Sequence, residues 1–239
     1  MRIAVISDIH GNVWALKRIL DHISENGASL ILNLGDSLYG PLDPRGTWEL
    51  IQKNRIISIA GNEDRIIIDP ETNIDQNDTL KYVISQLTDE TVEWLRSLPG
   101  DASPLENVFM CHGTPDSDSR YLLENIKNGY PVKRSREDLA GIVKNVSENI
   151  ILCGHSHLPG IAAAGGKIII NPGSVGLQAY DDDNPVFHQM QTGSNEARYS
   201  MVDINGDDVI VDRISLGYQF EEAASAAEKN NRYDWAGWL

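Results

Sequence analysis

Carboxylate, amide and imidazole side chains recur along this 239-residue chain, each time directly after a short apolar run. Asp8 and His10 come first, and residues two positions apart point the same way in an extended segment, so this pair could hold one metal ion. The later members of the set are Asp36, Asn62, His112, His155 and His157. Oxygen and nitrogen donors in this mixture favour a divalent transition metal such as Mn, Fe, Zn, Ni or Co over a thiolate-type structural zinc site.

The apolar runs before these donors predict buried strands, since they are nearly continuous Ile, Leu and Val. They cover residues 2–7, 30–34, 55–60, 108–111 and 150–153. Helices are expected between them at residues 13–25, 46–53, 75–98 with a break near 88, and 135–146. This alternation indicates right-handed crossovers and a mainly parallel sheet. Ligands bind such sheets at the C-terminal ends of the strands, so the seven donors should converge, and seven are more than one ion needs.

After His157 the pattern changes to short strands at residues 160–164, 167–170, 197–204 and 209–214, separated by turn signals such as Gly165-Gly166. This region predicts a second, more antiparallel sheet, followed by a helix at residues 221–229. Because no linker or repeat interrupts the chain, we expect a single domain over residues 1–239. Residues 215–239 would form a C-terminal helix and tail.

The amino-acid composition restricts which partners and which cellular location are expected. The formal charge of −15 argues against broad affinity for nucleic acid or for anionic membranes. An anionic substrate would then need bound cations to attract it. Cys111 and Cys153 lie within apolar runs and are expected in the core. No stretch approaches the roughly 18 apolar residues of a membrane span, and no leader pattern is evident, so a cytoplasmic protein is expected.

The donors belong to a series of short motifs that share Gly next to a polar side chain. In order these are Asp8-x-His10, Gly35-Asp36, Gly61-Asn62-Glu63-Asp64, His112-Gly113-Thr114-Pro115, Gly154-His155-Ser156-His157 and residues 171–176. The series resembles the calcineurin-like metallophosphoesterase family, and within it the compact bacterial and archaeal phosphodiesterase branch, over residues 5 to about 204. The resemblance implies an α/β fold of two packed mixed β-sheets that form a sandwich flanked by helices, a four-layer α/β/β/α arrangement.

The resemblance also implies a dinuclear site. One ion would be held by Asp8, His10, Asp36 and His157, and the other by Asp36, Asn62, His112 and His155, with Asp36 bridging. The catalytic residues would be Asp36, Asn62, Glu63, Asp64 and His112. Two divalent ions about 3.5–4 Å apart lower the pKa of a shared water and present it as hydroxide. That hydroxide would attack a phosphodiester in line, in a small organic or nucleotide substrate.

Three alternatives stay open. The chain could be a phosphomonoesterase, including a protein phosphatase, or a dinucleoside-polyphosphate hydrolase. It could also be a non-catalytic interaction scaffold with a retained metal site, as in a retromer subunit of the same family. The complete ligand set favours an enzyme, because a scaffold would be free to lose ligands.

One departure concerns Glu63, which stands where the commonest family motif has histidine. A glutamate offers no positive charge and donates a proton only if its surroundings raise its pKa. Glu63 could therefore be a general acid, a partner for Arg65, or a spectator. The departure is common in the compact branch and argues against strong monoesterase activity.

Each of the other polar and aromatic sets has two possible roles. A basic, loop-like set could meet distal phosphates or face solvent: Lys127, Lys133, Arg134 and Arg136. A second set could line a ring-binding cleft or simply pack: Trp14, Tyr39, Tyr180 and His188. Residues 171–176 could wall the substrate site or form a tight turn. Trp235 and Trp238 should fold back on the body or touch a second subunit, which would make a homodimer.

Overall fold

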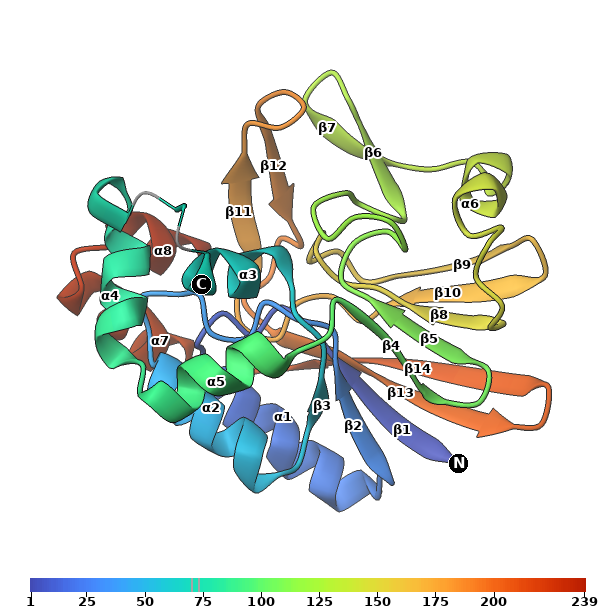
Figure 1. Cartoon of the computed structure of the whole chain (residues 1–239), viewed down its shortest axis with the longest axis horizontal. Coiled ribbons are helices and arrows are strands. Elements are labelled where there is room, and N and C mark those ends of the chain that lie inside the picture. The colour runs from blue at the N-terminus through green and yellow to red at the C-terminus, as the bar shows by residue number, and fades with distance from the viewer. Residues whose placement is uncertain (70, 73) are drawn as a thin grey trace.

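The computed structural model describes residues 1–69, 71–72 and 74–239. Two five-stranded mixed sheets pack face to face (Figure 1). The first sheet has the order β14 (Asp208–Leu216), β13 (Ala197–Asn205), β1 (Arg2–Ile6), β2 (Leu30–Asn33) and β3 (Ile57–Ser58). The second has the order β4 (Asp101–Leu105), β5 (Val108–Cys111), β8 (Ile150–Leu152), β10 (Lys167–Asn171) and β9 (Gly160–Ala164). The predicted sandwich is confirmed.

Helices cover the outer faces of the sandwich. α1 (Val13–Asn26), α2 (Pro44–Lys53), α4 (Asp78–Gln86) and α5 (Asp89–Ser97) lie on the side of the first sheet (Figure 1). α6 (Arg136–Ile142) packs on the second sheet, and α7 (Phe220–Lys229) and α8 (Tyr233–Trp238) close the molecule beyond α1. In the described residues, no helix has the length and apolar character needed to cross a membrane.

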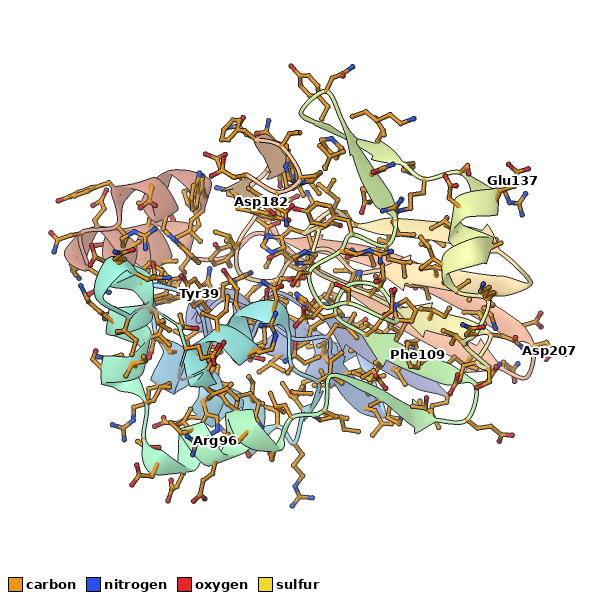
Figure 2. All side chains as sticks on the ribbon, turned by 45° about the horizontal axis from the view of Figure 1, so that its top comes forward. Tyr39, Arg96, Phe109, Glu137, Asp182 and Asp207 are labelled. Carbon is orange, nitrogen blue, oxygen red and sulfur yellow. The ribbon has the colours of Figure 1, made fainter. Side chains whose placement is uncertain are left out.

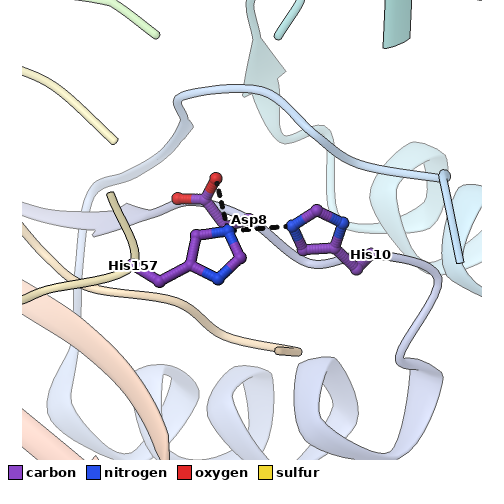
Figure 3. A group of neighbouring side chains, drawn as sticks. All are labelled: Asp8, His10 and His157. Carbon is purple, nitrogen blue, oxygen red and sulfur yellow. Dashed lines mark hydrogen bonds and ion pairs between the residues drawn. The ribbon is translucent and has the colours of Figure 1, made fainter. Parts of the chain in front are cut away.

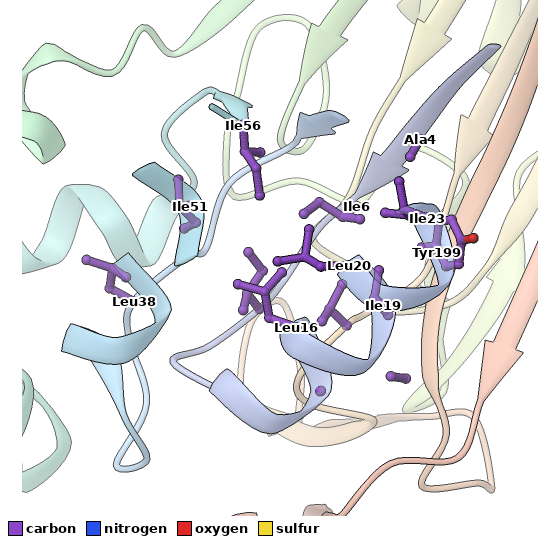
Figure 4. Packing of buried hydrophobic residues seen from close by; sticks show 14 of the residues in the cluster. Ala4, Ile6, Leu16, Ile19, Leu20, Ile23, Leu38, Ile51, Ile56 and Tyr199 are labelled. Atoms are coloured by element: carbon purple, nitrogen blue, oxygen red, sulfur yellow. The ribbon is translucent and has the colours of Figure 1, made fainter. Parts of the chain in front are cut away.

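The start of α1 shows how local sequence sets these elements. The Asn12 side chain accepts a hydrogen bond from Ala15 N, and the helix ends at Gly27 in the left-handed conformation, with φ +71°. These two residues set the ends of the helix expected at residues 13–25, because Asn caps free N–H groups and Gly tolerates positive φ. Between them, apolar residues at helical spacing, such as Leu16, Ile19 and Ile23, are buried against β1 and β13 (Figure 4). Each contributes about 1.5–3 kcal/mol by leaving water.

The predicted division of strands between the sheets was wrong. We expected one mainly parallel sheet from the first half and a second, antiparallel sheet from the residues after His157. Instead β13 pairs antiparallel with β1, and β10 pairs parallel with β8, so late strands complete both sheets. The apolar residues between the sheets come from both halves of the chain, including Val5, Leu32, Ile150 and Val202. Strand pairing over such separations is fixed by burial of both faces, which a local pattern does not reveal.

Several boundaries also differ. β3 is confined to Ile57–Ser58. The helix expected at residues 135–146 begins where Ser135 accepts a hydrogen bond from Asp138 N, and it ends early, at Ile142. The stretch carrying Lys127 and Lys133 is no loop but a hairpin of β6 (Glu124–Lys127) and β7 (Tyr130–Lys133). Between the strands expected at residues 167–170 and 197–204, the chain forms a second, unpredicted hairpin of β11 (Ala179–Asp182) and β12 (His188–Gln191). Both hairpins stand outside the sandwich, where propensity is a weak guide (Figure 1).

Candidate active site

The seven donor side chains meet at one edge of the sandwich, and we call them the donor cage. Each follows a strand end or begins a helix: Asp8 and His10 after β1, Asp36 after β2, Asn62 at the start of α3 (Asn62–Ile68), His112 after β5, and His155 and His157 after β8. All are buried except Asn62, which is half-buried. The predicted convergence on the C-terminal edge is therefore what the structure shows.

The backbone of the donor cage has an unusual conformation. Five donors have positive φ, between +51° and +67°: Asp8, His10, Asp36, His155 and His157. Side chains other than glycine seldom adopt this left-handed region, and such residues cluster at functional sites. Asp8 and His10 are therefore not in an extended segment, as we assumed, but in tight turns beyond β1. Their side chains still meet, because Asp8 N donates to Gly35 O and His10 N to Asp36 O, each at 3.0 Å.

Asp8, His10 and His157 form the first group of the donor cage (Figure 3). The Nε2 atoms of His10 and His157 lie 3.1 Å apart, and His157 Nε2 lies 3.3 Å from Asp8 Oδ1. His10 Nδ1 faces two acceptors, Tyr39 O and Glu63 Oε2, each at 3.0 Å, so it carries the ring proton. In the neutral ring, Nε2 then presents a lone pair toward His157, an arrangement that a shared cation would satisfy.

Asp36, His112 and His155 form the second group, with Asn62 beside it. His112 Nδ1 lies 2.8 Å from Leu34 O and therefore carries the ring proton. Its Nε2 lies 3.1 Å from both Asp36 Oδ2 and Asn62 Oδ1. Burial alone would lower the pKa of His112, but the Asp36 carboxylate outweighs it and raises the pKa to about 10. A nitrogen lone pair among oxygen acceptors needs a positive charge, which a metal ion supplies as well as a proton does.

Asp36 lies between the two groups. It belongs to the set with His112 and His155 and also to a set with His10 and Glu63. Burial opposes ionisation of Asp36, yet the His112 imidazole beside it lowers the pKa of the carboxyl. Asp36 thus lies within reach of a histidine from each group, with Oδ2 toward His112 and Oδ1 accepting a hydrogen bond from Glu63 N at 2.8 Å.

Two acidic residues beside Asn62 have different surroundings. Asp64 accepts hydrogen bonds from Ser37 N at 2.9 Å and Gly61 N at 3.1 Å, so it braces the two loops that carry Asp36 and Asn62. Glu63 contacts His10 and not Arg65, whose guanidinium instead binds Asp118 at 2.8 Å. The Arg65 alternative for Glu63 was therefore wrong. Burial raises the pKa of Glu63 to about 7.

The loop at residues 171–176 supports the donor cage from behind. Ser174 Oγ donates to Asp8 O at 2.8 Å, and Asn171 Nδ2 donates to Gly154 O at 2.9 Å. Gly176 N donates to Asp8 O at 3.0 Å, and a Cβ at Gly176 would overlap Ile9 O. The loop therefore ties the Asp8 turn to the His155 turn, and none of its residues lines the cavity described below.

Comparison with known proteins identifies this arrangement. Residues 1–194 match the calcineurin-like phosphoesterase superfamily domain. The chain belongs to this superfamily. It is 27% identical over 250 residues to the MJ0912 protein of Methanocaldococcus jannaschii, covering 98% of this chain and 95% of that one. It is 26% identical over 214 residues to phosphodiesterase YfcE of Escherichia coli, covering 85% and 88% of the two chains.

Solved structures confirm the fold of this superfamily member. A metallophosphoesterase from Sphaerobacter thermophilus superposes with a TM-score of 0.77 at 21% identity, over 99% of this chain and all of that one. The PH1004 protein of Pyrococcus horikoshii gives 0.74 at 22% identity, over 96% and 93% of the chains. The resemblance seen in the sequence motifs is confirmed. The superfamily match ends before β13, so α7 and α8 lie beyond it.

A cavity of about 600 Å³ opens over the donor cage of this phosphoesterase. We call the lining residues other than the donors and Glu63 the outer wall. The wall is formed by Tyr39, Gln76, Asn77, Asp78, Thr79, Leu177, Tyr180, Asp181, Asp182, Arg232, Trp235 and Trp238. Two of these, Tyr39 and Asp182, are labelled in Figure 2, and they come from the loop after β2 and from β11.

Only some of the aromatic residues singled out in the sequence line the outer wall. Tyr39, Tyr180, Trp235 and Trp238 line it, whereas Trp14 and His188 do not. His188 hydrogen-bonds to the hydroxyl of Tyr121 at 2.9 Å, and the Tyr121 ring stacks on His155 at 4.8 Å. The sequence analysis missed Tyr121, Arg232 and the aspartates of β11, since no motif marks them. Lys127, Lys133, Arg134 and Arg136 do not line this cavity.

Proposed function

We propose that this phosphoesterase is a phosphodiesterase that works with two divalent transition-metal ions, which could be Mn, Fe, Zn, Ni or Co. The observation that carries the proposal is the orientation of His112. Its Nδ1–H is used by Leu34 O, and its Nε2 faces the oxygens of Asp36 and Asn62 at 3.1 Å. A divalent cation at this point would satisfy the nitrogen and both oxygens together.

The donor groups support the assignment of two ions. Asp8, His10, Asp36 and His157 would hold one ion, and Asp36, Asn62, His112 and His155 would hold the other. The two triads found in the structure, Asp8–His10–His157 and Asp36–His112–His155, each keep their donor atoms within 4.8 Å. When bound, the ions would lower the pKa of water and neutralise charge on the phosphate.

The chain's own contribution is to orient and brace this site. Glu63 would act as a positioning residue: its Oε2 lies 3.0 Å from His10 Nδ1, and a carboxylate there fixes the ring and raises its basicity as a ligand. Asp64 would hold the Asp36 and Asn62 loops together through Ser37 N and Gly61 N. Neither role requires these two residues to contact substrate.

A preference for diesters is supported by the residue at position 63, which has no positive charge with which to stabilise a poor leaving group. Glu63 stands where most family motifs carry histidine, and it lines the cavity without being able to offer positive charge. The similarity to YfcE, which is described as a phosphodiesterase, points the same way. α8 completes the cavity from beyond the matched segment, which supports one catalytic unit spanning residues 1–239.

The test is a metal screen with two aryl substrates. The protein is stripped with chelator, reloaded with Mn, Fe, Zn, Ni or Co, and assayed with bis(p-nitrophenyl) phosphate and with p-nitrophenyl phosphate. We expect faster turnover of the diester, with two equivalents of metal bound by elemental analysis. Faster turnover of the monoester would favour a phosphatase, and no turnover with any metal would favour a scaffold.

A further inference from the structure

We propose that α8 forms a subsite for a flat aromatic ring on one arm of a diester with a single phosphate, and that Trp238 provides the stacking surface. This inference rests on the proposed function and names its substrate class. The argument depends on three features of the outer wall: the order of its rings, the way they are held, and its charge.

The aromatic rings continue outward from the donor cage without a break. The Trp235 ring meets His10 edge-on, with 5.9 Å between centroids, and it lies 6.4 Å from Tyr39. The Trp238 ring is the next one out, 6.1 Å from Trp235. A phosphate at the donor cage would therefore leave one ester arm directed along a row of aromatic faces.

Trp235 is fixed, and Trp238 has a free surface. Trp235 is 4% exposed and packs on Gly40, where a Cβ would come within 3.2 Å of the indole. The Arg232 guanidinium lies 5.9 Å from the centre of the Trp235 ring. Trp238 is only half-buried and lines the cavity, so part of its ring remains available for a ligand. An aromatic side chain held by packing loses little entropy when a ring stacks on it.

The charges of the outer wall select against a second phosphate. Among the described lining residues, Arg232 is the only Lys or Arg, and its guanidinium is already paired with Asp234, with Nε 2.9 Å from Oδ1. Asp78, Asp181 and Asp182 lie around the same opening. Among the lining residues that the structure describes, a polyphosphate chain would meet three aspartates and no unpaired arginine or lysine, whereas an uncharged ring would meet an aromatic surface. A volume of about 600 Å³ is enough for one ring system and one phosphate.

The experiment compares two diesters that have the same leaving group and the same charge. These are thymidine 5′-(p-nitrophenyl phosphate), which carries a ring on the second arm, and ethyl p-nitrophenyl phosphate, which does not. In the metal-loaded enzyme, Trp238→Ala should lower the ratio of their kcat/KM values about tenfold, since base–aromatic stacking is worth roughly that much. Trp238→Phe should recover most of the ratio. Trp94→Ala, on α5 and away from the cavity, is the matched control and should leave the ratio unchanged.

Calorimetry supplies a second readout that needs no turnover. Thymidine 5′-monophosphate should bind the metal-loaded wild type about tenfold more tightly than it binds Trp238→Ala, while inorganic phosphate should bind both equally. If both diesters are hydrolysed and the ratio survives Trp238→Ala, the ring subsite is wrong and the proposed function stands. If neither diester is hydrolysed, the proposed function fails, and equal affinity of the two proteins for the nucleotide would overturn the subsite as well.

Discussion

The donor cage and the outer wall are built on different parts of the fold. The cage sits on turns that follow the central strands β1, β2, β5 and β8, and those turns are cross-linked by backbone hydrogen bonds such as Asp8 N to Gly35 O at 3.0 Å. Most of the wall comes from the start of α4, from β11 and from α8, which lie outside the sandwich, and Tyr39 joins it from the loop after β2. On the proposed function, phosphate chemistry would take place at the ends of the central strands, and most contacts to the rest of the substrate would lie on the periphery.

The two regions also differ in charge balance. Carboxylates in the cage face imidazoles, and the pKa of Asp36 is lowered by His112 against the effect of burial. Aspartates of the wall face solvent or the open cavity, with one paired arginine among them. Changes in the cage should therefore remove activity altogether, whereas changes in the wall should alter which substrate is preferred.

Asp36→Asn should have the largest effect. The amide keeps the shape of the side chain but loses the negative charge that both donor groups share, so we expect turnover to fall below detection and both metals to bind weakly. Elemental analysis and a diester assay on the same preparation test this. Asp21→Asn, an exposed position on α1, is the control. Full activity in Asp36→Asn would show that Asp36 does not bridge.

Gly176→Ala tests the bracing of the cage rather than its chemistry. The new methyl group would overlap Ile9 O in the turn that carries Asp8 and His10. We expect a loss of about 1–3 kcal/mol in the free energy of unfolding, together with weaker metal binding, because overpacking at a buried site forces the backbone to shift. Urea denaturation measures the first quantity. Gly100→Ala, where nothing lies within 4 Å of the added atom, should be nearly neutral. Equal stability of the two variants would contradict this account.

Glu63→Gln probes the boundary between cage and wall, since Glu63 contacts His10 and also lines the cavity. Removing a carboxylate behind a ligating histidine typically costs 10–100-fold in metal affinity or activity. We expect a loss in that range that is equal for diesters with good and poor leaving groups and is accompanied by weaker metal binding. Glu93→Gln, exposed on α5, serves as control. A loss confined to poor leaving groups, with metal binding intact, would instead make Glu63 a general acid.

The donor cage was predictable because its residues carry their own signal. Asp36, His112 and His155 follow short apolar runs that are typical of buried strands, and the carboxyl ends of such strands meet at one edge of a sheet. The wall was not predictable, because its shape depends on where a hairpin and a terminal helix dock. Tyr121 and Arg232 lie in no motif, and they matter only through their contacts with His155 and Trp235. The same limit explains why β13 was assigned to the wrong sheet: its pairing with β1 joins positions 4 and 201.

Glu124, which belongs to neither the donor cage nor the outer wall, offers the most specific test of charge balance at a buried carboxyl group. It is buried on β6, and its Oε2 has no hydrogen-bond partner among the described residues. Burial raises its pKa from 4.5 to about 7 in the folded protein, against the opposing effects of Ser156, Lys133 and Arg134. Between these two values the folded state holds a proton that the unfolded state has released. Stability from this group is therefore full below about pH 4.5 and is lost as the pH rises through about 7.

Glu124→Gln removes that proton exchange and keeps the shape of the side chain. Relative to wild type, the variant should gain on the order of 2–3 kcal/mol in the free energy of unfolding between pH 4.5 and pH 7.5. Urea denaturation at both pH values measures the change, and taking the difference from wild type removes the contribution of carboxylates that both proteins share. If the difference in the free energy of unfolding between variant and wild type does not vary with pH, the charge of Glu124 is as well balanced by its neighbours as the carboxylates of the donor cage are. The distinction between a balanced cage and unbalanced surroundings would then fail at this position.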